Sequence, residues 1–80
     1  MIKNKTVANN ISALMLEISG QLDDSVAYVA ENCDQDDLHN YRRVIGSIMG
    51  IIGIDILNNI YREFPEIKPE EYYLPLKKDT

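Results

Sequence analysis

Apolar residues recur at helical spacing through the first part of the chain. When residues are placed at steps of about 100°, the apolar positions between residues 7 and 29 fall on one stripe. Glu17, Asp24 and Glu31 lie on the opposite side, as in a helix that rests one face on a core. The pattern predicts a helix over residues 6–32, capped by Thr6, with the stripe Val7, Ala8, Ile11, Leu14, Met15, Ile18, Leu22, Val26 and Val29.

A second apolar pattern follows the polar cluster ENCDQDD at residues 31–37. Asp34 is a suitable N-cap, and Asp36 and Asp37 fall in the first turn, where free amides and the helix dipole favour negative charge. Pro65 clashes with a continuing helix, so the pattern predicts a helix over residues 35–64. One wide arc carries Leu38, Tyr41, Ile45, Ile48, Met49, Ile52, Ile56 and Ile60, and roughly the other side carries Val44, Ile51 and Ile54.

These helices predict an all-α fold, an antiparallel helical hairpin with a C-terminal tail over residues 65–80, in a single domain spanning residues 1–80. A helix that is apolar on two sides needs neighbours on two sides, and one hairpin covers only one flank. The chain is also short of core, and its single cysteine, Cys33, excludes an internal disulfide. We therefore expect two copies to pair into a homodimeric four-helix bundle.

Three glycines line one edge of the second predicted helix, with Leu57 continuing the line. Each interior glycine costs about 1 kcal/mol relative to alanine, so we expect a compensating close approach of another backbone. G-x-x-x-G spacing also occurs in membrane helices, but the uncharged run over residues 44–54 is shorter than the roughly 20 residues that a span needs. The predicted helix-packing and dimer interface is Gly46, Gly50, Gly53, Ile48, Ile51, Ile52 and Leu57.

The charge composition limits which classes of partner are expected. The net charge is -5, from 13 acidic and 8 basic residues, and the basic residues are scattered. Nucleic acid is therefore not an expected partner, because phosphate binding needs a clustered basic face, whereas a basic protein partner would suit the acidic surface. The N-terminal residues show no secretory signal pattern, so we expect a cytoplasmic protein.

Few residues are candidates for catalysis or metal binding. Asp36 and His39 have the spacing of part of a carboxylate metal box, but the inward-facing glutamates of such a box are missing. Cys33 with His39 as its base lacks an acid to orient the histidine. We therefore expect no catalysis, no metal and no cofactor. Asp55 is expected to pair with Arg62 or with an arginine of a partner chain, and a buried functional carboxylate is the alternative.

The tail carries three prolines together with apolar anchors. We expect the tail either to fold over its own bundle or to dock on another protein, since aromatic anchors contribute much of the affinity at interfaces. The anchors named for partner docking are Tyr72, Tyr73 and Leu74.

The second half of the chain resembles small uncharacterised bacterial helical proteins. The likeness rests on a YRR-x2-G-x2-MG helix followed by YRE-x-P, and the matching residues are Tyr41, Arg42, Arg43, Gly46, Met49, Gly50, Leu57, Asn58, Ile60, Tyr61, Arg62, Glu63, Pro65, Glu66 and Pro69. The resemblance implies a bacterial, soluble protein and supplies no activity, substrate or catalytic residue.

Taken together, the sequence predicts a non-enzymatic homodimer that acts by protein–protein interaction, as an adaptor or an inhibitor. The alternative is a binder of a small apolar ligand, or a minimal enzyme, built on the glycine-lined groove with Asp55, His39 or Cys33 as its polar group.

Overall fold

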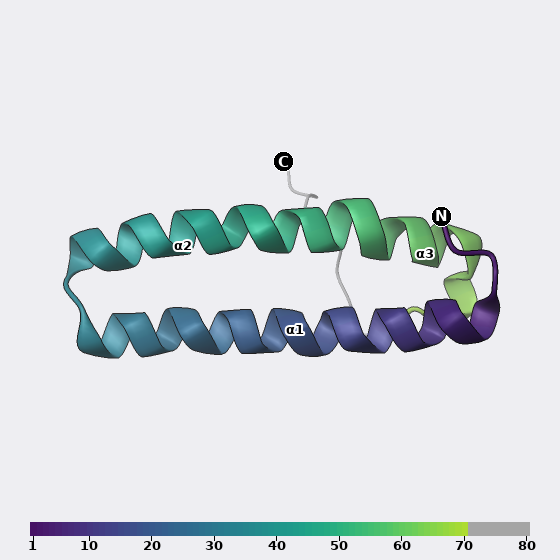
Figure 1. Cartoon of the computed structure of the whole chain (residues 1–80), viewed down its shortest axis with the longest axis horizontal. Helices are drawn as coiled ribbons and strands as arrows, with labels where there is room; N and C mark the ends of the chain where they lie inside the picture. Colours follow the sequence, from purple (N-terminus) through teal and green to yellow (C-terminus); the bar gives the residue numbers. More distant parts are fainter. Residues whose placement is uncertain (71–80) are drawn as a thin grey trace.

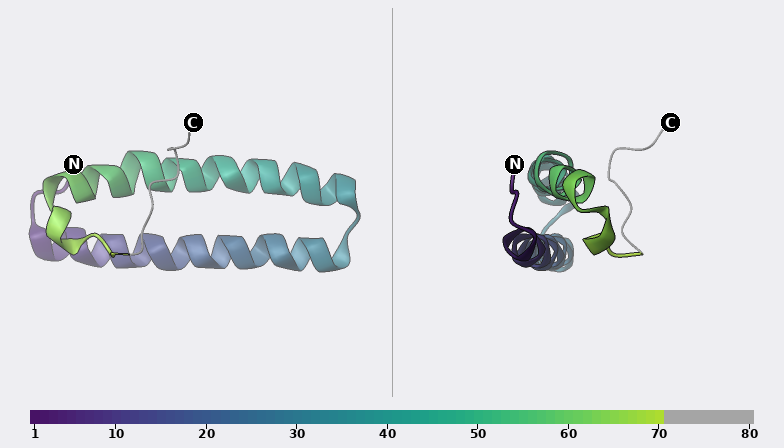
Figure 2. Two further views of the ribbon diagram at one scale, coloured as in Figure 1. Left: turned by 180° about the vertical axis from the view of Figure 1, so that it is seen from behind. Right: turned by 90° about the vertical axis from the view of Figure 1, so that its right-hand side faces the viewer.

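Two antiparallel helical arms joined by a short turn make up the protein (Figure 1). The computed structural model describes residues 1–70, and it contains no strand over that range. This confirms the predicted all-α hairpin. The first arm is a single helix, and the second is three helical segments in series, followed by a 3₁₀ turn that folds back at the open end (Figure 2). The segments are α1 (Lys5–Asn32), α2 (Gln35–Gly50), the π-helix η1 (Ile51–Leu57), α3 (Asn58–Glu63) and η2 (Pro65–Ile67).

The first helix begins slightly earlier than the sequence pattern predicts. Asn4 is the N-cap, and its side-chain oxygen accepts a hydrogen bond of 3.0 Å from the Val7 amide. The prediction that Thr6 caps this helix is wrong, because asparagine is at least as good a cap as threonine and stands before it in the chain.

The start of the second arm agrees with the sequence. Asp34 has extended backbone angles, and its carboxylate accepts a hydrogen bond of 2.9 Å from the Asp37 amide. The arm ends at Glu63, one residue before the predicted end, since the backbone angles of Phe64 are no longer helical (φ -131°, ψ 71°). A residue that precedes proline is disfavoured in the α conformation, which explains why Phe64 leaves the helix before Pro65.

A π-helical segment interrupts the second arm, where the sequence predicts one uninterrupted α-helix. The Asn58 amide donates to the Gly53 carbonyl, five residues earlier, so η1 has more residues per turn than an α-helix. In a continuous α-helix, Leu57 and Tyr61 would lie about 120° and 160° around the axis from Ile45. All three side chains are nonetheless buried, with Leu57 only 1% exposed. The π segment therefore turns the end of the arm toward α1.

The core is small and lies toward the open end of the hairpin. Buried side chains come from both arms, and a ring of half-buried apolar residues surrounds them. Val7 and Leu14, which the sequence pattern places in the stripe, are 45% exposed, so this part of the predicted stripe is wrong. The inward face of α1 is centred closer to Ala8 and Ser12. The buried apolar residues are Ala8, Leu38, Ile45, Ile52, Leu57, Ile60 and Tyr61.

Two serine–tyrosine hydrogen bonds connect the arms. Ser12 Oγ lies 2.5 Å from the Tyr61 hydroxyl in the core, and Ser25 Oγ lies 2.8 Å from the Tyr41 hydroxyl nearer the turn. Each pair joins a residue of α1 to a residue of the second arm. Together they fix how far one arm can slide along the other.

Candidate functional site

An exposed row of aliphatic side chains runs along one flank of the hairpin. Val44, Ile48 and Ile51 follow one another at spacings of four and three, which places them on one side of the second arm. Val44 is 49% exposed and Ile51 is 57% exposed. Val7 and Leu14 are seven residues apart and occupy one side of α1. We call Val7, Leu14, Val44, Ile48 and Ile51 the apolar flank.

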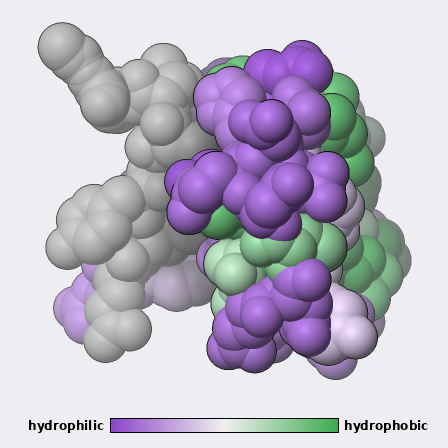
Figure 3. Space-filling model, turned by 90° about the vertical axis from the view of Figure 1, so that its left-hand side faces the viewer, coloured by the Kyte–Doolittle hydropathy of each residue, from purple (hydrophilic) through white to green (hydrophobic). Residues whose placement is uncertain are grey.

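The two rows lie on the same side of the molecule. In each arm an exposed residue directly precedes a core residue, as Val7 precedes Ala8, Val44 precedes Ile45 and Ile51 precedes Ile52. In two right-handed helices that face each other and run in opposite directions, this offset points to the same flank. Figure 3 agrees, because hydrophobic surface follows the right-hand side of the view over both the upper and the lower arm.

The glycines lie away from this flank. Gly46 is two residues from both Val44 and Ile48, about 200° around an α-helix. A Cβ added at Gly46 or Gly50 would meet no atom within 4 Å, so the hairpin itself makes no close approach there. The three glycines that the sequence places on one edge of the helix therefore differ in the structure. Gly46 and Gly50 have open space beside them, whereas Gly53 is buried.

Several residues of the predicted dimer interface are used inside the single chain. Ile52, Gly53 and Leu57 are buried in the hairpin's own core, because the π segment turns them toward α1. Ile48 and Ile51 remain exposed and available to a partner. Tyr72, Tyr73 and Leu74, the predicted docking residues, lie outside the described residues.

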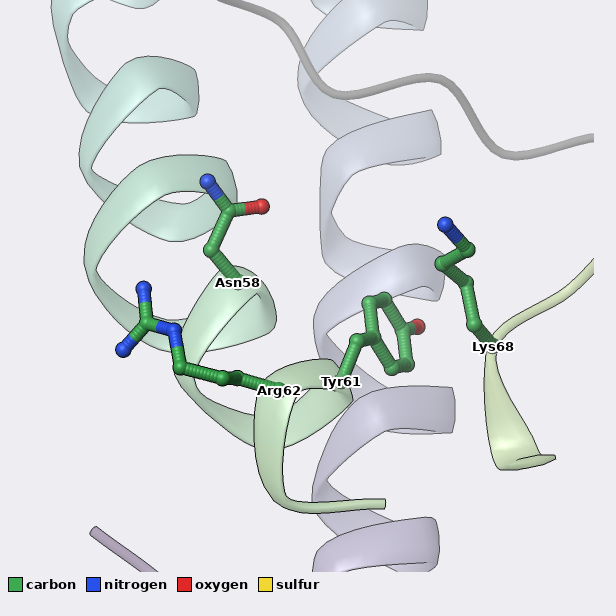
Figure 4. Close-up of a pocket in the computed structure, with 4 residues that line it drawn as sticks. All are labelled: Asn58, Tyr61, Arg62 and Lys68. Carbon is green, nitrogen blue, oxygen red and sulfur yellow. The ribbon is translucent and has the colours of Figure 1, made fainter. Parts of the chain in front are cut away.

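A polar cavity of about 210 Å³ opens beside α3, and Figure 4 shows its lining residues, Asn58, Tyr61, Arg62 and Lys68. The Asn58 Oδ1 atom is buried and has no hydrogen-bond partner. Arg62 and Lys68 point to opposite sides of the Tyr61 ring, so their charges do not converge on one point (Figure 4). No glycine and no carboxylate stands among the described lining residues, so this is not the apolar groove of the alternative prediction.

The residues that the sequence offers for chemistry near the turn, Cys33, Asp36 and His39, are all exposed. Cys33 is an exposed free cysteine in the turn, and His39 is exposed on α2. Within residues 1–70, no group of three or more histidine, cysteine, aspartate or glutamate side chains is placed to hold a metal ion.

Asp55 does not pair with Arg62. The described part of the chain shows one ion pair, between Lys5 and Glu66, while Arg62 donates instead to Asn59 Oδ1 at 3.2 Å. The expected pairing within the chain fails because Asp55 lies in the π-helix, where a spacing of seven residues no longer returns to the same side. The alternative of a buried carboxylate also fails, since Asp55 is exposed.

One carboxyl group has a shifted acidity. Hydrogen bonding to its own backbone amide, followed by the bond to Lys5, lowers the pKa of Glu66 below its usual 4.5. The Lys5 Nζ to Glu66 Oε2 distance is 3.0 Å, and this pair joins η2 to the first turn of α1. Its position at the open end indicates a structural contact and not a reactive site.

Comparison with protein families, with curated proteins and with solved structures finds no match for this chain. The segment Gln35–Glu63 is long and apolar enough to cross a membrane by length and composition, and one third of its most apolar part (33%) is buried in the hairpin. Core helices of soluble proteins meet the same criterion. Within the described residues, the apolar flank is a surface on which aliphatic side chains from both arms are exposed.

Proposed function

We propose that the protein acts through protein–protein contacts and that its first partner is a second copy of itself. The observation that carries the proposal is the apolar flank, to which both arms contribute aliphatic side chains that are about half exposed. Contiguous exposed apolar surface of this kind marks interaction sites in soluble proteins. Two copies that share this flank form the four-helix bundle that the sequence predicts.

The side of the hairpin that carries the apolar flank is large enough for a dimer. The arm formed by α1 has 28 residues, so this whole side is about 40 Å long and, across two packed helices, about 20 Å wide. Such a face offers on the order of 800 Å², which is what each partner of a standard interface buries. A closed two-fold pairing would cover the flank of both copies at once.

The small core of the hairpin also favours association with a second copy. Only seven apolar residues in the described part of the chain are buried, the single cysteine allows no internal disulfide, and residues 1–70 offer no group of side chains placed to hold a metal ion. Chains of this length usually need such support or an oligomeric partner. Burying the flank supplies the missing apolar contacts.

A lipid bilayer is the competing occupant of the flank. The candidate span Gln35–Glu63 contains Asp36, Asp37, Asp55 and the pair Arg42 and Arg43, and charged groups are costly in hydrocarbon. The chain as a whole carries a charge of -5, which anionic lipid surfaces repel. These charges favour a protein partner, and the surface of the dimer would remain acidic enough to attract a basic protein.

Two aspartate substitutions test the proposal and locate the contact. Ile48→Asp places a charge in the apolar flank, and we expect it to reduce the molar mass measured by light scattering from twice the chain mass to one. Gly46→Asp adds the same charge to the same helix on the far side, and we expect it to leave the dimer intact. Circular dichroism confirms that both variants remain helical, and vesicle flotation of the unmodified chain reports any lipid binding.

The results separate the possibilities. Dissociation by Gly46→Asp but not by Ile48→Asp would place the contact on the glycine side and contradict the proposal. Flotation of a monomeric chain with neutral vesicles would instead assign the flank to lipid.

A further inference from the structure

The two ends of the hairpin differ in charge. The half nearest the turn, residues 19–48, has six acidic and two basic residues, a net charge of -4. The other half of the described chain, residues 1–18 and 49–70, has five acidic and four basic residues and also carries the N-terminus. Figure 3 looks directly onto the turn end and shows a mostly hydrophilic surface there. The acidic residues of the turn half are Asp23, Asp24, Glu31, Asp34, Asp36 and Asp37.

Two symmetric arrangements bury the apolar flank. If the two-fold axis runs along the arms, the hairpins are parallel and both turns lie at the same end. If the axis crosses the arms within the plane of the flank, the hairpins are antiparallel and each helix packs against its own copy. The apolar residues alone fit either arrangement, so the charges decide between them.

The parallel arrangement brings two ends of charge -4 side by side. Their separation would be close to one interhelical distance, about 10 Å, where physiological salt screens only part of the repulsion because its Debye length is about 8 Å. The antiparallel arrangement separates these ends by most of the length of an arm. It also places each acidic turn beside the open half of the other copy, whose side chains carry a net charge of only -1, so the repulsion is weaker there.

We infer that the dimer is antiparallel, with the turn of each hairpin lying against the open end of the other. The inference rests on the proposed function, because it concerns the same apolar flank, and it adds the orientation of the partner. Ile51 lies near the middle of the second arm, and in this arrangement it packs close to its own copy across the two-fold axis. The acidic turns then point outward from the two ends of an elongated bundle.

The native cysteine reports the orientation without any substitution. Cys33 is exposed in the turn and is the only cysteine in the chain, so a spin label attached to it marks the acidic end of each copy. Because each turn lies about half an arm from the axis, pulsed dipolar spectroscopy of the labelled dimer should give a distance of roughly 40 Å or more. Sedimentation of the same labelled sample supplies the molar mass.

The molar mass tests the dimer, and the label distance tests its orientation. A labelled chain that sediments at a single chain mass contradicts the proposed dimer itself. A dimer whose label distance falls to roughly 20 Å or less, the spacing of neighbouring helices plus the labels, overturns the antiparallel orientation while the dimer stands. A distance of roughly 40 Å or more at physiological salt supports the antiparallel orientation.

Discussion

At the scale of single residues, Ser12 shows why the inward face of α1 is hard to predict. It is 4% exposed and is the only polar side chain buried in the described core. A hydrophobicity pattern counts serine as a surface residue, so the predicted stripe moves toward Val7 and Leu14. The hydroxyl is tolerated inside because Tyr61 lies within hydrogen-bonding distance, and a partner 49 positions away cannot be read from periodicity.

Removing the Ser12 hydroxyl should destabilise the protein. We expect Ser12→Ala to lower the free energy of unfolding by about 1 kcal/mol, because a buried hydrogen bond between the arms is lost. Ser47→Ala is the matched control, since the exposed Ser47 hydroxyl bonds only to the Arg43 carbonyl of its own helix. Chemical denaturation compares the two variants. Equal stability would mean that the Ser12 to Tyr61 contact contributes nothing.

Asn58 presents the opposite case, a buried polar atom without a partner. A buried acceptor that lacks a hydrogen bond costs about 1 to 3 kcal/mol, so Asn58→Leu should raise the free energy of unfolding by about 1 kcal/mol. Asn59→Leu should bring no such gain, because Asn59 donates to the Asp55 carbonyl at 2.6 Å. Loss of stability in Asn58→Leu would show that the amide has an essential partner in solution.

At the scale of the elements, helix starts are predictable where local chemistry decides them. The acidic first turn and the N-cap at Asp34 need only neighbouring residues, and the structure agrees with the sequence there. The π segment is different, because i→i+5 bonding is rare in proteins and the run of isoleucine and glycine carries no local signal for it. What selects it is the burial of Leu57, Ile60 and Tyr61 against α1, which is visible only after the hairpin is assembled.

The open space at Gly46 gives an element-scale prediction. Gly46→Ala and the control Gly20→Ala should each raise the free energy of unfolding by about 0.8 to 1 kcal/mol, because alanine favours the helix and a Cβ meets nothing within 4 Å at either site. Thermal unfolding measures both. If only the control is stabilised, another chain packs closely on Gly46, which would move the interface away from the apolar flank.

The contact between η2 and α1 should respond to acid. Because the pKa of Glu66 is lowered in the folded state, its contribution to stability is present above the unfolded value near 4.5 and is lost as the pH falls through the folded pKa. We expect Glu66→Gln to unfold at a slightly lower temperature than the unmodified protein at neutral pH, and the difference to disappear in acid. A difference that persists in acid would assign it to packing and not to charge.

At the scale of the whole molecule, the sequence is sufficient to predict the hairpin, but it does not predict which face of each helix is buried and which is exposed. The excess of apolar residues in the second helix predicts two covered sides; the hairpin covers one of them, and it divides the residues differently from the glycine line. Val44, Ile48 and Ile51 stay outside, while Ile52 and Leu57 turn inward. That division depends on the π-helical segment η1, which rotates the end of the second arm about its axis. Counting apolar residues cannot predict this rotation.

The most direct measurement is sedimentation equilibrium of the unmodified chain at micromolar concentration. If two copies share the apolar flank, the molar mass will be twice the 9.1 kDa of one chain, and the unfolding temperature will rise with protein concentration. A fully folded species of 9.1 kDa, with an unfolding temperature independent of concentration, would contradict the shared flank.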